Sequence, residues 1–177
     1  MHPLSKMRPE RLGSLEERVK NGLQMWQDEV PELDSSGKAV CGRAVALGGV
    51  LNHLFNDALV EFDLKYPEYG VLATLRASGS PYSMTQKQLL ETILFSSGGM
   101  SNLLARLEKK GLITRQNDRE DRRVTHVRLT KSGLAIANKA MAVQSATENT
   151  LCAVLNNTER EALISALAKL LNSALNV

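Results

Sequence analysis

The chain has few of the residue types on which most enzyme and metal chemistry depends. Its 177 residues include two cysteines and three histidines. Cys41 and Cys152 lie far apart, with no Cys-x-x-Cys or Cys/His cluster around either, so a structural zinc site is not expected. No histidine stands in a nucleophile or metal motif, and no glycine-rich phosphate loop follows a strand. We therefore expect no enzyme activity, no metal and no cofactor.

Long apolar runs are missing as well. The longest apolar stretch, residues 44–51, is far shorter than the roughly 20 residues that span a bilayer. Residues 1–13 carry scattered charges and two prolines but no apolar core, so they are not typical of a secretory signal. At 177 residues the chain is long enough to bury a core. These features predict a soluble, cytoplasmic protein without membrane contact.

Charge is present but unevenly distributed. The formal net charge is only +3. Residues 82–131 hold ten Lys/Arg and five Asp/Glu, a local charge of +5, whereas the rest of the chain holds twelve and fourteen, a local charge of −2. The positive potential is therefore concentrated on one segment.

Apolar residues at helical spacing predict that most of the chain is helical. Capping residues indicate helix starts at Ser14, Thr85, Thr130 and Thr158, and Gly111 indicates a helix end because glycine adopts the left-handed conformation. Helices are expected over residues 14–30, 40–59, 68–77, 85–93, 97–110, 131–149 or on to 155, and 158–171. The last of these has a broad apolar stripe for a surface helix.

Two segments between these helices are typical of strands. Residues 112–116 and 124–129 are rich in β-branched residues and flank a charged turn. They predict a β-hairpin directly after a helix-turn-helix. The expected fold class is therefore mainly α with a small β-hairpin wing.

The helix at residues 97–110 is expected to have one apolar and one polar face. Its inward positions are Met100, Leu104, Leu107 and Gly111, which leaves outward Ser97, Ser101, Asn102, Ala105 and Arg106. Small polar residues let a helix approach the major groove closely, and its N-terminal amides favour phosphate. Asn102 could pair with an adenine edge and Arg106 with a guanine or a phosphate. A merely solvated helix face is the alternative.

The hairpin tip, residues 118–123, favours the DNA interpretation. Arg119, Arg122 and Arg123 follow directly from the helix-turn-helix, and the weakly hydrated guanidinium group suits a narrow minor groove. Asp121, two residues before Arg123, is expected to hold the orientation of that arginine by an ion pair. A solvated loop without a role is the alternative.

A set of motifs between residues 85 and 133 supports a family resemblance. The motifs are Gly98-Gly99-Met100-Ser101-Asn102, Arg106-Leu107-Glu108-Lys109-Lys110-Gly111-Leu112-Ile113, Asp121-Arg122-Arg123 and Leu129-Thr130-Lys131-Ser132-Gly133. With them the chain resembles the MarR family of winged helix-turn-helix transcription regulators. The resemblance implies an obligate homodimer, with N- and C-terminal helices at the two-fold interface and two recognition helices in successive major grooves of a pseudo-palindromic operator.

The same resemblance implies a division of the chain within one intertwined domain. Residues 1–64 would form the N-terminal extension and dimerisation helices. Residues 65–131 would form the winged helix-turn-helix DNA-binding lobe, and residues 132–177 the C-terminal dimerisation helices.

The upstream part resembles the PecS/HucR group within that family. The shared features include an extra N-terminal helix with Trp26, followed by Glu29-Val30-Pro31-Glu32-Leu33-Asp34. In that group a small anionic effector, often urate, binds between the extra helix and the DNA-binding lobe and releases DNA. The group's effector residues correspond to Trp26, Gly70, Leu103 and Arg115 in this chain.

Two of these effector positions depart from the group. Gly70 lacks an acidic group and Leu103 stands in place of an arginine. Unpaired donors and acceptors of an anionic purine cost about 1 to 3 kcal/mol each on desolvation, so urate is not expected. A more apolar or differently charged effector near Trp26 is the hypothesis. As alternatives, Trp26 packs as a core or interface aromatic and Arg115 contacts phosphate.

Together these features predict a sequence-specific transcription regulator that binds double-stranded DNA. It is expected to be a repressor whose operator affinity is lowered by a small molecule. One alternative is regulation by oxidation of Cys41 or Cys152, which are otherwise buried free thiols. Another is an effector-independent DNA-architectural or dimerisation protein.

Overall fold

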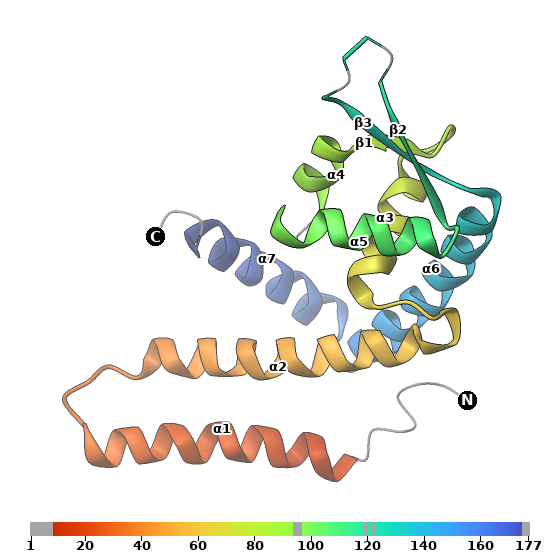
Figure 1. The fold of residues 1–177 in the computed structure, drawn as a ribbon. Helices are drawn as coiled ribbons and strands as arrows, with labels where there is room; N and C mark the ends of the chain where they lie inside the picture. The colour runs from red at the N-terminus through yellow and green to blue at the C-terminus, as the bar shows by residue number, and fades with distance from the viewer. Residues whose placement is uncertain (1–8, 94–96, 119, 122, 175–177) are drawn as a thin grey trace.

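A computed structural model describes residues 9–93, 97–118, 120–121 and 123–174 and is mainly helical with a small antiparallel sheet (Figure 1). The helices and strands in chain order are α1 (Pro9–Glu29), α2 (Ser36–Ala58), the 3₁₀ helix η2 (Val60–Phe62), α3 (Tyr66–Ala77), β1 (Ser83–Thr85), α4 (Gln86–Thr92), α5 (Ser97–Lys109), β2 (Ile113–Asn117), β3 (Thr125–Leu129), α6 (Lys131–Cys152) and α7 (Asn157–Ala174). This order confirms the expected winged helix-turn-helix fold class. Among the described helices, none combines the length and apolar character that crossing a bilayer needs.

Two predicted helix caps are confirmed. The Thr85 hydroxyl accepts a hydrogen bond from the Gln88 amide at 3.1 Å, and the Gln88 side chain accepts from the Thr85 amide at 2.8 Å. The Thr130 hydroxyl accepts from the Gly133 amide at 2.9 Å. These bonds satisfy amides that a helix start leaves unpaired.

Two other predicted helix starts are wrong. Helix α1 begins at Pro9, ahead of Ser14, where a proline fits because the first helical residue needs no amide donor. Helix α7 is capped by Asn156, two residues before Thr158. Asn156 and Glu159 exchange side-chain-to-amide hydrogen bonds at 2.9 and 3.0 Å.

The sheet has one strand that the sequence pattern did not predict. Its order is β1-β3-β2, and β1 pairs antiparallel with β3, with Ser83 opposite Arg128. A strand of three residues carries no measurable periodicity, and its partner lies more than forty positions later. The sheet therefore ties the start of the helix-turn-helix to the wing.

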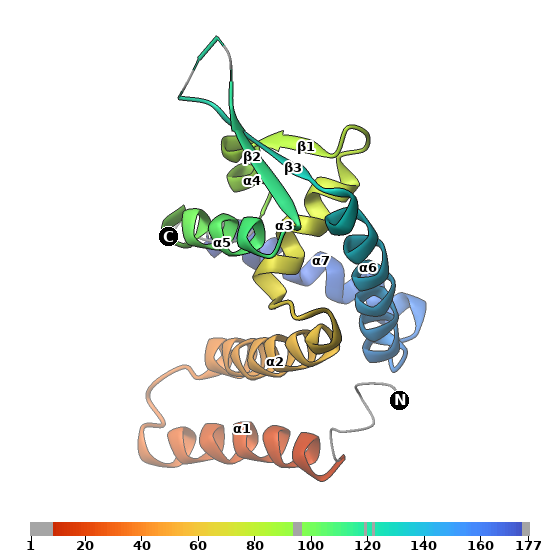
Figure 2. The same ribbon diagram turned by 45° about the vertical axis from the view of Figure 1, so that its right-hand side comes forward.

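The core lies between α3, α5, α6 and the sheet. Its fully buried side chains include Leu72, Leu75, Leu89, Leu104 and Val127. Helices α1 and α2 form a long antiparallel hairpin that lies on the opposite side of this core from the wing (Figures 1 and 2). The wing and the hairpin of α1 and α2 thus lie at opposite ends of the molecule, with α5 between them (Figures 1 and 2).

The cysteines are both free, and neither is fully buried as was expected. Cys41 is exposed, whereas a buried thiol was predicted, and Cys152 is half-buried. The fully buried residues of α2 are Leu54 and Ala58 at its C-terminal end, so the N-terminal half of α2 leaves Cys41 uncovered within one chain.

A close approach joins α6 to the base of the wing. The Thr130 hydroxyl donates to the Gly111 carbonyl oxygen at 2.7 Å while it caps α6. A Cβ atom added at Gly133 would lie 1.9 Å from the Leu112 carbonyl oxygen. Glycine at position 133 is therefore a steric requirement, which explains the sequence Thr130-Lys131-Ser132-Gly133 at this junction.

Replacing Gly133 with alanine should destabilise the protein, because the new methyl group meets backbone and cannot be accommodated by a side-chain rotation. The expected loss in the free energy of unfolding is about 1 to 3 kcal/mol or more, measured by urea denaturation. Gly37→Ala is the matched control, since its new Cβ has no neighbour within 4 Å and alanine is the better helix former. Equal stability of Gly133→Ala and the unsubstituted protein would contradict the close approach.

Candidate nucleic-acid interface

Helix α5 has the two faces that the sequence predicts. Its apolar face is buried in the core through Met100, Leu103, Leu104 and Leu107. Its other face exposes Ser101, Asn102, Ala105 and Arg106. Leu103, expected beside an effector, is a core residue with 4% exposure, and Gly111, expected inward, is exposed.

The C-terminal end of α5 has the predicted conformation. Ser97 is the first residue of the helix, and its side chain lies outside the described part of the structure. Gly111 follows the helix with a φ of 69°, the left-handed conformation that the sequence predicts for a helix end. Among the residues whose side chains are described, the exposed face of α5 includes Ser101, Asn102, Ala105 and Arg106.

The wing tip is organised by two aspartates. Asp118 Oδ1 accepts hydrogen bonds from the amides of Glu120 and Asp121 at 2.8 and 3.2 Å. Asp121 Oδ1 accepts from the Arg123 amide at 2.9 Å. Asp121 thus contacts the main chain of Arg123, where an ion pair with its guanidinium group was expected.

The arginines of the tip are only partly described. Arg123 is exposed. Arg119 and Arg122 lie outside the described residues. The turn that Asp118 and Asp121 stabilise fixes the backbone from which Arg123 projects.

Asp118 also joins the tip to β3. Its Oδ2 lies 3.0 Å from His126 Nε2. The Glu120 amide, His126 and the Asp121 amide together lower the pKa of Asp118 to about 2. The carboxylate is therefore ionised throughout the physiological pH range and can hold the turn.

An ion pair between Arg115 and Glu108 joins the wing to α5. Arg115 donates from Nε and Nη2 to Glu108 Oε2 at 2.9 and 2.6 Å, and the Arg115 amide donates to Glu108 Oε1 at 3.1 Å. The hydrogen bonds from Arg115 lower the pKa of Glu108. Arg115 is thereby held by Glu108 at the protein surface, with 32% of its side chain exposed.

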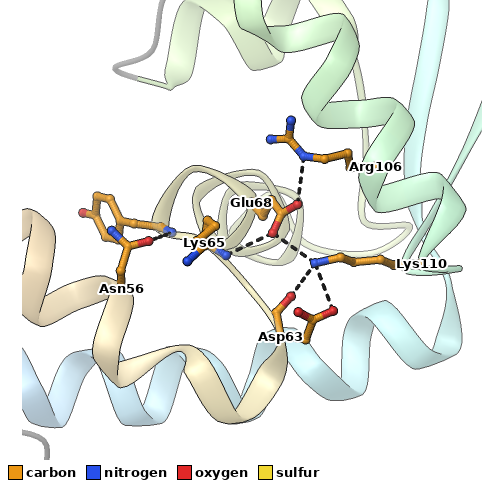
Figure 3. Close-up of polar contacts among 7 residues, drawn as sticks. Asn56, Asp63, Lys65, Glu68, Arg106 and Lys110 are labelled. Carbon is orange, nitrogen blue, oxygen red and sulfur yellow. Dashed lines mark hydrogen bonds and ion pairs between the residues drawn. The ribbon is translucent and has the colours of Figure 1, made fainter.

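A buried carboxylate lies behind the recognition helix, and sequence analysis did not single it out. Glu68 is 2% exposed, in the first turn of α3. Its Oε2 accepts from the Lys65 amide at 3.0 Å and from Lys110 Nζ at 3.2 Å, and its Oε1 accepts from Arg106 Nε at 3.2 Å (Figure 3). Lys110 also contacts the Asp63 carbonyl oxygen and carboxylate.

The hydrogen bonds to Glu68 keep it ionised. Burial raises the pKa of Glu68, but hydrogen bonds from the Lys65 amide, Lys110 and Arg106 lower it more, so the pKa lies below its ordinary value. One sequence feature points to this cluster. Arg106 and Lys110 are four residues apart at the C-terminal end of α5, so both cations lie on the same side and can share one carboxylate.

The expected effector residues are not brought together in one chain. Trp26 is 44% exposed on α1, with Lys38 Nζ 3.9 Å from the ring centroid. Gly70 is half-buried on α3 and Arg115 lies on β2. Helix α1 and β2 lie at opposite ends of the molecule in both views (Figures 1 and 2).

The fold and these contacts define a class of protein. Helices α4 and α5 form a helix-turn-helix, and strands β2 and β3 form the wing that follows it. The exposed polar face of α5 and the arginines of the wing both belong to the positively charged segment, residues 82–131. This is a winged helix-turn-helix DNA-binding protein.

Comparison with known proteins identifies the family. The MarR family signature matches residues 62–124. An HTH-type transcriptional regulator of Bacillus cereus is 31% identical over 134 residues, covering 75% of this chain and 87% of the relative. The transcriptional regulator PecS of Dickeya dadantii is 25% identical over 151 residues, covering 85% and 91%. The chain belongs to the MarR family of transcription regulators.

A solved structure agrees with this assignment. The MepR–DNA complex of S. aureus matches with a TM-score of 0.67 and 28% identity, over 72% of this chain and 92% of that one. The relatives are transcription regulators, which confirms the expectation that the chain is not an enzyme.

The Asp118 carboxyl should titrate near pH 2, well below the ordinary value of about 3.9. Because the pKa is depressed in the folded state, the stabilisation of the wing turn is fully present above pH about 3.9 and is lost as pH falls through about 2. Carbon-13 NMR of the side-chain carboxyls measures the midpoint. In His126→Ala the midpoint should rise but stay depressed, since two amides still donate. An ordinary midpoint in the unsubstituted protein would show that the turn does not form in solution.

Proposed function

We propose that the chain is a homodimeric repressor that binds a pseudo-palindromic operator and releases it when a small effector binds. Helix α5 would enter the major groove through Ser97, Ser101, Asn102 and Arg106. The wing would reach the minor groove through Arg119, Arg122 and Arg123, with Asp121 fixing the tip.

The observation that carries this proposal is the exposed polar face of α5. Ser101 and Asn102 lie on the solvent side of a helix whose opposite side is buried in the core. Small side chains permit close approach to base edges, and an asparagine can bond an adenine with both its donor and its acceptor. The neighbouring wing adds exposed guanidinium charge suited to phosphate or a narrow minor groove.

A homodimer is supported by apolar surface that a single chain leaves uncovered. Helix α7 exposes Leu163, Ile164, Leu167, Leu170 and Leu171, each more than 40% accessible. Helices α1 and α2 expose Met25, Trp26, Val40, Val45 and Leu47. Surface of this kind marks an interaction site, and a two-fold pair of these helices would place two copies of α5 one helical turn of DNA apart.

An effector is supported by the way α5 is held. Arg115 binds Glu108 of α5 with both Nε and Nη2, so an anion that paired with Arg115 would compete with Glu108 and loosen the wing from the helix. Trp26, in an interface with a second chain, offers an apolar wall. Operator affinity measured in the presence of candidate metabolites tests this part; if none lowers affinity, the effector-independent alternative holds.

Regulation by thiol oxidation is the other alternative. The exposure of Cys41 makes it accessible to oxidants. Loss of DNA binding on peroxide treatment, absent in Cys41→Ser or Cys152→Ser, would support it.

Arg123→Ala should weaken operator binding about tenfold and reduce the slope of log affinity against log salt by about two, because each protomer of the dimer loses one contact with the DNA phosphates that line the groove. Fluorescence anisotropy with DNA from upstream of the protein's own gene, at several salt concentrations, measures both. Lys139→Ala is the matched control, since it removes one exposed charge from α6, away from α5 and the wing. Unchanged affinity and slope for Arg123→Ala would refute the minor-groove assignment.

Leu171→Glu should convert the protein to a monomer and abolish operator binding, because a charge on α7 would be buried without a partner in the dimer. Size-exclusion chromatography with light scattering measures the mass. Val60→Glu is the control, since Val60 is 67% exposed, close to the 66% of Leu171, but lies on η2. A dimer of unchanged stability in Leu171→Glu would exclude α7 from the interface.

A further inference from the structure

We infer that Glu68 is a positioning residue for DNA recognition: it holds Arg106 by Nε and leaves the outer edge of the guanidinium group free for DNA. The inference rests on the proposed contact between α5 and DNA. It assigns a role in that contact to a buried residue that cannot itself reach the nucleic acid.

The geometry of the Glu68–Arg106 pair separates an anchored edge from a free one. Arg106 Nε donates to Glu68 Oε1 at 3.2 Å. The Glu68 side chain is 3% exposed, whereas that of Arg106 is 57% exposed. Figure 3 shows the two terminal nitrogens of Arg106 pointing away from Glu68, and no hydrogen bond joins them to another described residue. One side of the guanidinium is fixed and the other faces solvent.

The anchor itself is rigid. Glu68 Oε2 is held by the main-chain amide of Lys65 and by Lys110 Nζ. Because Oε2 has these partners, Oε1 is left for Arg106. The carboxylate is thus fixed to the first turn of α3, and its position does not depend on a mobile surface side chain.

The position of Arg106 on α5 places its free terminal nitrogens where they could bind DNA. Arg106 lies four residues after Asn102, so the two side chains follow each other along the same face of the helix. The terminal nitrogens of an arginine bind two acceptors at once, as on guanine or phosphate. A guanidinium group held in advance loses less freedom on binding than a mobile one, which strengthens the bound state.

The net charge around Glu68 indicates that the cluster orients Arg106 and does not simply attract DNA. Glu68 and Asp63 are negative, Arg106 and Lys110 are positive, and all four lie in one cluster (Figure 3). The cluster is therefore close to neutral and adds little to long-range attraction of DNA. Its effect should appear in the discrimination between operator and other sequences.

Glu68→Gln tests the inference, because an amide donor would then face the Lys65 amide and Lys110, which disturbs the side chain that holds Arg106. Operator affinity should fall about tenfold while affinity for non-specific DNA changes less than twofold. In an Arg106→Ala background, Glu68→Gln should have little further effect on operator affinity. Glu61→Gln, the same change at an exposed position of η2, should leave both affinities unchanged.

Thermal melting of each variant separates positioning from stability, since a purely structural role would lower the melting temperature but not the ratio of operator to non-specific affinity. Additive effects of Glu68→Gln and Arg106→Ala would overturn the inference, as would an unchanged ratio in Glu68→Gln. If Arg106→Ala and Arg123→Ala both bind operator like the unsubstituted protein, the proposed function itself fails.

Arg106→Lys keeps the inference testable if Glu68→Gln does not fold. Lysine preserves the charge but lacks the planar pair of terminal nitrogens, so with Nζ held by Glu68 it cannot bind two acceptors on DNA as the free edge of arginine does. Operator affinity should then fall as far as in Arg106→Ala. Full operator affinity in Arg106→Lys would overturn the inference.

Discussion

What α5 presents to solvent depends on how its other side is held. Four apolar side chains of α5, Met100, Leu103, Leu104 and Leu107, are buried in the core, and a buried side chain of this size stabilises by roughly 1.5 to 3 kcal/mol. Partly exposed ion pairs contribute about 0 to 1 kcal/mol each. Apolar burial therefore fixes the helix in place, and the ion pairs of Glu68 and Glu108 set the directions of the arginines they bind.

Most of the fold follows from local sequence signals because those signals act within one turn of helix. Thr85 and Thr130 cap as expected, Gly111 takes a positive φ, and the faces of α5 are divided as the apolar period predicts. The misplaced start of α7 has the same kind of cause. Asn156 and Thr158 both suit a cap with an acidic residue three positions later, and only the backbone geometry selects Asn156.

The features that sequence reasoning missed depend on distant partners. Strand β1 exists because it pairs with β3, and three residues alone give no strand pattern. Glu68 has the same difficulty, because a glutamate three residues after a helix N-cap is ordinary in sequence. Its importance comes from burial against Arg106 and Lys110, about forty residues later. Of the candidate site, the polar face of α5 was predictable, whereas the groups that support it were not.

The positive charge of residues 82–131 is only partly available to DNA. Arg106 and Lys110 are paired with Glu68, and Arg115 is bound to Glu108. The residues free to neutralise phosphate are therefore fewer than a count of Lys and Arg in this segment indicates. Charge along the sequence locates the interface, but the pairing of each arginine decides whether it adds to long-range attraction of DNA or is held in one direction by a neighbouring carboxylate.

In the dimer that we propose, the distance between two copies of α5 is set through the joint between α2 and α3. Leu54 and Ala58 are buried at the C-terminal end of α2. Between them, Asn56 Oδ1 accepts a hydrogen bond from the Tyr66 amide of α3 at 3.0 Å. Asp63, with a φ of 51°, then contacts Lys110 at the end of α5. The same few residues thus connect the apolar helices to the recognition helix. If this joint is rigid, the arrangement of the two chains in the dimer fixes the distance between the two copies of α5, and therefore between the two DNA sites that they contact.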